Sequence, residues 1–310
     1  HYIVAMAYSW GWLKFIPEKT ILRIVKLLKP LDIPLQLFTI IIECGVVFIL
    51  LDYHLALALL AGIALMHITI FLTTGILFWE YILTNIVLGV LLIINAPLLP
   101  EALFTYENWV VFVLILFLFP LRKKIWKPNG LAWWDSPWAG RIHWQVVGES
   151  GKTYGLYNDF IAPHEYCFGR VYAWFLSKKK WPYYHLGELQ DLRLRDMVLK
   201  TKGDVHQLEA IREAHGKYMY DAAEEQIHDT YLTTYFRNFN LGEQASVLPS
   251  FLRFLKPPAT SFFYWGTDEK FTGQEKVVKI IVTFKEEYFD GEGFVVTSEE
   301  LSLIHISEPT

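Results

Sequence analysis

Three long apolar runs near the start of the chain limit most strongly what it can fold into. The runs are Leu35–Leu51, Leu55–Leu72 and Ile76–Ile94, and only three residues separate each run from the next. A helix that crosses the hydrocarbon core of a bilayer needs about 20 residues. Runs of this length and spacing are hard to bury in a water-soluble fold, so they predict tightly joined transmembrane helices. A shorter run, Trp109–Leu121, predicts a fourth crossing if it tilts or borrows residues from Leu103–Asn108.

The amino-acid composition of the chain changes near Trp126. Over the whole chain 53% of the residues are apolar and 19% are charged, whereas a soluble domain carries about 25% charged residues. The apolar excess lies in the first third, and no later run is long enough to cross a bilayer. We therefore predict a membrane α-helical bundle of at least four transmembrane helices in residues 1–125, truncated at its N-terminus. A soluble α+β domain in residues 126–300 follows it.

The charges predict which side of the membrane each part faces. The net charge of −4 gives no reason to expect a nucleic-acid partner. Basic residues flank the four runs, and none lies in the connections on the opposite side. They are Lys14, Lys19, Arg23, Lys26, Lys29, Arg122, Lys123, Lys124 and Lys127. By the positive-inside rule the C-terminal domain is cytoplasmic, provided that Trp109–Leu121 crosses the bilayer.

Alternating and turn patterns predict the elements of the soluble half. Two β-hairpins are expected, and they could share a sheet. Two or three helices, divided near Gly203, are expected in Leu186–Phe239. The hairpins pair Arg141–Gly148 with Thr153–Tyr157, and Val277–Phe284 with Phe294–Thr297, and a further helix is expected in Pro163–Leu176.

We make separate structural predictions for three segments outside these elements. Tyr2–Ile16 reads as the end of another span that the start of the chain cuts. Thr20–Lys29 places its basic residues on one face, which predicts a helix in the membrane surface or, alternatively, a solvated helix. Residues 301–310 resemble translated sequencing-adapter sequence, so we expect a non-native tail. The alternative for that segment is a real C-terminal strand.

Three polar residues within the apolar runs are the candidate site residues. Glu43, His67 and Glu80 have similar predicted depths, and charged groups inside a bilayer are usually paired or functional. We hypothesise that they form a polar pocket in which a carboxyl and an imidazole exchange a proton. The alternative is that Glu80 reaches the interface while Glu43 and His67 only bond helices together. The sequence assigns no cofactor and leaves open whether the chain is an enzyme.

Motifs in the soluble half do not predict a specific reaction or metal site. Glu225 and His228 have the Glu-x-x-His spacing of di-iron bundles, but the second such pair is missing, so no metal site is predicted. The sequence around Gly148–Gly151 lacks the nucleophile elbow of hydrolases, and no phosphate-binding glycine loop occurs.

Several stretches resemble bacterial HTTM-domain proteins, the membrane relatives of vitamin K-dependent γ-carboxylase. In the membrane half they are Thr39–Glu43, Leu65–His67 and Gly75–Trp79. In the soluble half they are Leu131–Asp135, Val147–Tyr154, Ala162–His164, Phe271–Val277 and Tyr288–Gly291. The resemblance implies an integral protein of the bacterial inner membrane.

The resemblance also implies what the protein could bind. The carboxylase relatives use a reduced quinone, oxygen and carbon dioxide, and their C-terminal domain faces the lumen. Their quinone-deprotonating lysine would fall near Tyr8 or Ser9, where this chain has no lysine, and Lys14 is the nearest. The expected function is a membrane protein of unassigned activity that binds a lipid or quinone in the polar pocket. The alternative is a non-enzymatic membrane scaffold whose C-terminal domain binds a protein partner.

Overall fold

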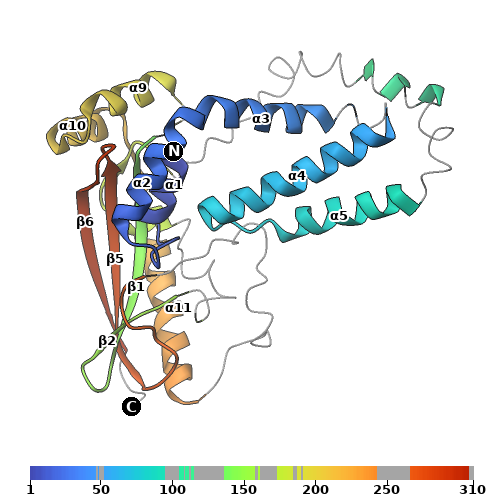
Figure 1. Ribbon diagram of the computed structural model, residues 1–310. Helices are drawn as coiled ribbons and strands as arrows, with labels where there is room; N and C mark the ends of the chain where they lie inside the picture. The colour runs from blue at the N-terminus through green and yellow to red at the C-terminus, as the bar shows by residue number, and fades with distance from the viewer. Residues whose placement is uncertain are drawn as a thin grey trace. The chain divides into compact units, whose positions relative to one another are not determined.

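The computed structural model divides the chain into two units. One unit combines residues 1–26 with residues 132–310, and the other contains residues 27–131 (Figure 1). We call them the sheet unit and the helical unit, and each is described by itself. The structure describes residues 1–46, 48, 52–94, 105–107, 109–111, 113–114, 136–157, 160, 173–183, 187–189, 191–242 and 266–306.

The helical unit contains α3 (Asp32–Gly45), α4 (Tyr53–Thr74) and α5 (Trp79–Ile94). The helix α4 begins where the Asp52 side chain accepts a hydrogen bond from the Leu55 amide, 2.8 Å away. It ends at Gly75, whose φ of 74° is left-handed and favours glycine. A short link then reverses the chain into α5, so α4 and α5 are antiparallel neighbours (Figure 1).

One helix of the described residues, α4, is long and apolar enough to cross a membrane. The helix α5 is apolar but shorter. The first apolar run forms α3, which ends at Gly45, and most of Trp109–Leu121 lies outside the described residues. The expected bundle of four spans is therefore not confirmed, while the mixed α+β character of the chain is.

The sheet unit is built on four antiparallel strands in the order β2-β1-β5-β6 (Figure 1). Both predicted hairpins form, and β1 joins β5 so that they share this sheet. Period-2 alternation sends Ile142, Trp144 and Val146 to one face, where they are buried. The strands are β1 (Trp138–Gly148), β2 (Thr153–Gly155), β5 (Val277–Phe289) and β6 (Phe294–His305).

Three helices cover the face that carries Trp144, which we call the core face. Aspartates 191, 204 and 221 cap their first turns by accepting backbone amide hydrogen bonds, which explains where each helix starts. The division near Gly203 is confirmed. The helices are α9 (Leu192–Thr201), α10 (Val205–His215) and α11 (Ala222–Asn240). Smaller elements are the 3₁₀ helices η1 (Lys29–Leu31) and η4 (Ala173–Leu176) and the short strands β3 (Lys180–Trp181) and β4 (Lys217–Tyr218).

The first helix, α1 (Tyr2–Ser9), lies on the opposite face of the sheet, which we call the α1 face. Its residues from Val4 to Ser9 are buried, and the Tyr8 ring lies 5.7 Å from the Phe294 ring. The sequence reading made this segment the end of a membrane span, whereas the structure groups it with the sheet. A short apolar helix satisfies either role, because both environments remove its side chains from water.

Two further expectations concern segments at the edges of these units. The helix α2 (Glu18–Leu28) forms where a basic helix was expected, with Ile21 and Val25 buried. Residues 301–305, expected to be a non-native tail, continue β6 and pair with residues 279–283 of β5. Apolar residues such as Leu301, Leu303 and Ile304 suit a strand whatever their origin, so the tail stays a prediction.

Candidate functional site

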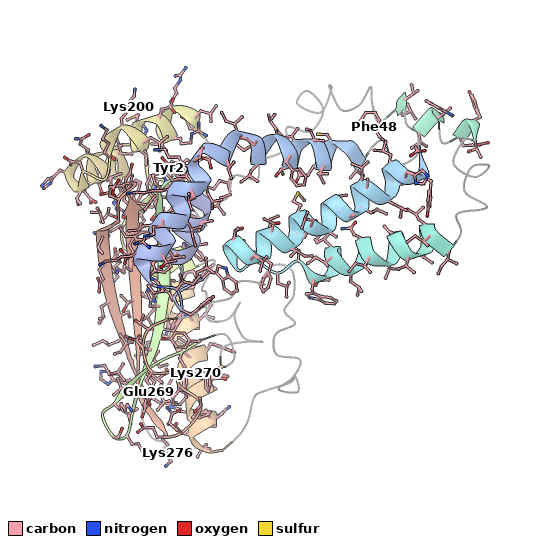
Figure 2. All side chains as sticks on the ribbon, in the orientation of Figure 1. Tyr2, Phe48, Lys200, Glu269, Lys270 and Lys276 are labelled. Atoms are coloured by element: carbon pink, nitrogen blue, oxygen red, sulfur yellow. The ribbon has the colours of Figure 1, made fainter. Side chains whose placement is uncertain are left out.

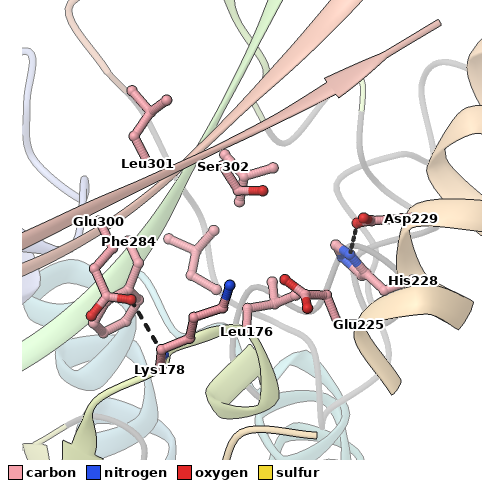
Figure 3. A pocket seen from close by; sticks show the side chains of 11 residues that line it. Leu176, Lys178, Glu225, His228, Asp229, Phe284, Glu300, Leu301 and Ser302 are labelled. Atoms are coloured by element: carbon pink, nitrogen blue, oxygen red, sulfur yellow. Dashed lines mark hydrogen bonds and ion pairs between the residues drawn. The ribbon is translucent and has the colours of Figure 1, made fainter. Parts of the chain in front are cut away.

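A cavity of about 310 Å³ lies between α11 and the core face of the sheet (Figure 3). Its apolar wall comes from the strands and from the end of η4, and its polar residues come mainly from α11 and from the segment after η4. We call it the α11 pocket. Its lining residues are Ile142, Leu176, Lys178, Glu225, His228, Asp229, Val282, Phe284, Glu300, Leu301 and Ser302.

Helical spacing places the three titratable residues of α11 at this pocket. Glu225, His228 and Asp229 stand at positions i, i+3 and i+4, which share one side of a helix. His228 is buried, and its ring packs against Trp144 at 5.3 Å and Phe175 at 5.6 Å. The sheet therefore fixes the position of the imidazole, and the helix brings the two carboxylates to the rim.

The polar residues of the rim have partners that hold them in place. The Tyr220 hydroxyl donates to Glu225 at 2.6 Å, and the Lys178 ammonium lies 5.6 Å from the centre of the Tyr220 ring. Glu300 accepts from the Lys178 amide at 3.3 Å and from the Ser177 hydroxyl at 3.4 Å (Figure 3). Three carboxylates and one ammonium thus surround the opening.

The His228 and Asp229 side chains are neighbours in the pocket. Their closest atoms, Nδ1 and Oδ1, are 3.6 Å apart, which is too long for a hydrogen bond (Figure 3). Burial raises the pKa of Asp229, and the neighbouring His228 partly opposes that rise. A cationic group that entered the pocket would favour the ionised form of this carboxylate.

Among the described residues, no hydrogen bond or ion pair joins the three site residues predicted in the apolar runs, so their pocket stays a prediction. His67 contacts α5, because its ring stacks on Tyr81 at 5.4 Å and meets Phe78 edge-on at 5.8 Å. Its Nδ1 lies 2.9 Å from the Ile63 carbonyl. Glu80 has one carboxylate oxygen, Oε2, that is buried and has no hydrogen-bond partner. Glu43 is exposed on α3, and no hydrogen bond or ion pair among the described residues joins it to His67 or Glu80.

Sequence reasoning missed two buried charge clusters on the sheet. Glu286 pairs with Arg212 on the core face, and Glu287 pairs with Arg141 on the α1 face. The signal was visible, because two consecutive glutamates interrupt a strand that is otherwise largely apolar. Buried charges of this kind are rare unless they are paired. Among the described residues, no group of three or more His, Cys, Asp or Glu could hold a metal.

No protein-family model, no curated protein and no solved structure matches this chain. The resemblance to HTTM-domain proteins therefore stays a prediction.

Proposed function

We propose that this chain is an integral membrane protein whose sheet unit binds a small organic cation in the α11 pocket. The membrane part of the proposal rests on the exposed apolar surface of the helical unit. The helix α5 has no buried residue, and α4 is about 33 Å long at 1.5 Å per residue, against about 30 Å for the hydrocarbon core. Figure 2 shows side chains projecting from both helices.

Water is a poor solvent for this surface. Burying a leucine or isoleucine side chain gains about 1.5–3 kcal/mol, so an array of exposed ones costs tens of kcal/mol in water. A bilayer removes that cost, because its tails are as apolar as the side chains. The exposed residues include Leu83, Ile86, Val87, Leu88, Val90, Leu91, Ile93 and Ile94 of α5 and Leu55, Leu65, Ile68 and Leu72 of α4.

Because the sheet unit combines two segments that are far apart in the sequence, we expect an even number of membrane crossings between them. Residues 1–26 and 132–310 belong to that one unit, so the chain that enters the bilayer after residue 26 returns to the same side before residue 132. Two crossings by α4 and α5 meet this condition. Four crossings, as predicted from the apolar runs, meet it equally, and the basic residues that flank the runs then favour the cytoplasm for the sheet unit.

Membrane insertion and topology are tested on the full chain. After Cys44 and Cys167 are replaced by serine, single cysteines are introduced as Glu18→Cys, His54→Cys and Lys152→Cys. We expect the chain to stay with membranes in alkaline carbonate. We also expect an impermeant maleimide to label positions 18 and 152 from one side. Four crossings place position 54 on the opposite side, and two crossings by α4 and α5 alone place it on the same side. Release by carbonate, or labelling of 18 and 152 from opposite sides, would refute the proposal.

The charge balance of the α11 pocket supports the ligand class. Glu225, Asp229 and Glu300 offer three carboxylates, while Lys178 supplies one ammonium. A ligand with an ammonium group would offset the excess, and its apolar body would contact Val282 and Phe284. Aromatic rings beside carboxylates are a common arrangement for organic cations.

Binding is tested with three probes of matched size. Calorimetric titration with phenethylamine, phenylethanol and phenylacetate separates the charge from the apolar body. We expect the amine alone to bind, and Asp229→Asn to weaken it about tenfold, because a charged partner is worth about 1.5–3 kcal/mol. Gln226→Ala, on the exposed side of α11, is the control. Equal binding of all three probes would contradict the proposal.

A second candidate function concerns a lipid or quinone headgroup near Glu80. The observation that favours it is the buried, unpartnered Oε2 of Glu80, close in the sequence to the ring that stacks on His67. A hydroxyl donor from a lipid or quinone would satisfy that oxygen. We expect copurifying lipid or quinone to fall in Glu80→Leu and to persist in Glu43→Leu. Unchanged extracts of both variants would remove this candidate.

A further inference from the structure

Three cations lie together on the α1 face of the sheet. Arg141 of β1 and Lys285 of β5 lie directly opposite each other in the register, and Lys14 lies in the turn after α1. The Glu287 carboxylate forms ion pairs with both Arg141 and Lys285. We call Ser9, Lys14, Arg141, Lys285 and Glu287 the Arg141 cluster.

The Glu287 carboxylate is already fully engaged. It accepts a hydrogen bond from the Ser9 hydroxyl, lies 2.8 Å from the Lys285 ammonium and lies 3.4 Å from Nη2 of Arg141. Burial opposes its ionisation, but Arg141, Lys285 and Ser9 together lower the pKa of Glu287 below its ordinary value. One carboxylate therefore bonds two cations and one hydroxyl.

Arg141 keeps most of its hydrogen-bonding capacity unused. Its exposed fraction is 7%, and its Nε and Nη1 atoms are buried without an acceptor. A guanidinium has five N–H donors, so the one on Nε and the two on Nη1 are unsatisfied. Buried donors of a charged group are costly to leave unpaired. These N–H groups of Arg141 therefore lack a hydrogen-bond acceptor.

Lys14, unlike Arg141 and Lys285, forms no ion pair with a carboxylate among the described residues. Its ammonium lies 3.9 Å from the centre of the Tyr8 ring. The preceding residue, Leu13, has a φ of 60°, a left-handed conformation that costs a leucine roughly 1–2 kcal/mol. Strained backbone of this kind often marks functional sites. Here the strained turn carries the ammonium that lies over the Tyr8 ring.

We propose that Lys14 and Arg141 bind an oxyanion of the phosphate class on the α1 face of the sheet. Its oxygens would accept from Nε and Nη1 of Arg141 and from the Lys14 ammonium, which is half-buried and reaches the surface. Within the Arg141 cluster, three cations and one carboxylate leave two positive charges, which match a phosphate dianion. Glu299 of β6, opposite Lys285 in the register, and Glu18 lie outside the cluster. Glu18 acts on Lys14 more weakly than Arg141, Glu287 and Lys285 do. The phosphate is either that of a dissolved compound or that of a lipid headgroup.

The first arm of the test uses radiolabelled inorganic phosphate. The full chain in detergent is dialysed to equilibrium at constant ionic strength, with chloride as the background anion. We expect saturable binding that weakens about tenfold or more in Lys14→Gln and Arg141→Gln, because each removes charged hydrogen bonds. Lys152→Gln, which removes an exposed cation paired with Glu269 at 2.7 Å, should bind as the wild type does.

The second arm distinguishes the two sources of phosphate. Micelles are doped with phosphatidic acid or with an uncharged diacylglycerol, and the melting temperature of each variant is recorded. Stabilisation by phosphatidic acid that needs Lys14, without binding of free phosphate, assigns the site to a headgroup. Binding of free phosphate assigns it to a dissolved compound.

Two results would overturn the proposal. One is the absence of saturable binding in both arms. The other is binding that Lys14→Gln leaves equal to that of the wild type. The half-buried position of Lys14 makes this variant informative even where Arg141→Gln fails to fold.

Discussion

Glu286 and Glu287 are consecutive residues of β5, yet each is buried and each pairs with a different arginine on a different face of the sheet. Glu286 accepts two hydrogen bonds from Arg212 of α10, and Glu287 accepts one from Arg141 of β1. The register of β5 with β6 shifts between these two residues. The pair therefore fastens α10 to one face of the sheet and α1, through Ser9, to the other.

The Glu286 cluster should be the more sensitive of the two to substitution. Besides Arg212, the carboxylate accepts from Tyr183 and, at 2.7 Å, from Thr297. Glu286→Gln would leave the buried Arg212 with only the half-exposed Glu209 as its carboxylate partner, 2.8 Å from Nε, and loss of a buried partner costs up to about 3–5 kcal/mol. Denaturant titration of the full chain in detergent, followed by tryptophan fluorescence, measures the loss. Glu269→Gln, which breaks an exposed pair, should cost less than about 1 kcal/mol. Equal midpoints for the two variants would contradict this prediction.

Ser9→Ala should loosen the attachment of α1. It removes a hydrogen bond to a charged acceptor, which is worth about 1.5–3 kcal/mol. Hydrogen exchange of the amides of residues 4–9 should become faster than in the wild type, while the amides of α11 keep their protection. Ser150→Ala is a matched control, because Ser150 donates to Glu275 at 2.9 Å on the exposed hairpin. Unchanged exchange in α1 would show that packing alone holds the helix.

Stability should rise with pH through the titration of Lys14. Burial, followed by the charge of Arg141, lowers the pKa of Lys14 to about 8, against 10.5 for an exposed lysine. Between these values the unfolded chain binds the extra proton, so the free energy of unfolding increases from about pH 8 upward. The charged groups that act on Lys14 or on the adjacent Tyr8 are Glu18, Arg141, Lys285 and Glu287.

Melting temperatures between pH 7 and 9.5 in a phosphate-free buffer check this dependence. Lys14→Met should be more stable than the wild type at pH 7, and the difference should shrink as the pH rises. Lys26→Met is the control, since Lys26 pairs with Glu292 at an exposed position. Parallel curves for the wild type and Lys14→Met would refute the assignment.

Two glycines of the helical unit should respond to alanine in opposite directions. Gly75→Ala places a side chain at a φ of 74° and should destabilise the α4–α5 pair by roughly 1–2 kcal/mol. Gly89→Ala, inside α5 with open space around it, should stabilise it by about 0.5–1 kcal/mol. Unfolding in mixed detergent reports both changes. The same sign for the two variants would argue against the helix boundary at Gly75.

Local patterns predicted much of the sheet unit. The alternation around Trp144 and the turn after Gly148 define the first hairpin, and Asp191, Asp204 and Asp221 mark helix starts that a reader can recognise. Each of these patterns spans only a few residues, so it can be recognised in the sequence without knowledge of the fold. The join between β1 and β5 was left open, because it brings together residues more than a hundred positions apart.

The sites were harder to predict, because they depend on contacts between distant segments. Depth along a helix made Glu43, His67 and Glu80 look alike, but depth does not say which side of α3 carries Glu43. The clusters at Glu286 and Glu287 need partners from α10, β1 and α1. No local sequence pattern around Arg141 or Lys14 indicates that these two residues act on each other electrostatically.

The sheet unit is discontinuous in sequence, and this sets an order for its assembly. Ser9 leaves the ribosome long before Glu287, from which 278 positions separate it. At about 5–20 residues per second that interval lasts roughly 15–60 s. During this time the apolar N-terminal helix has no strand to cover it, while the apolar helices of the helical unit are already emerging behind it. Until translation reaches β5, α1 therefore lacks its final packing partner.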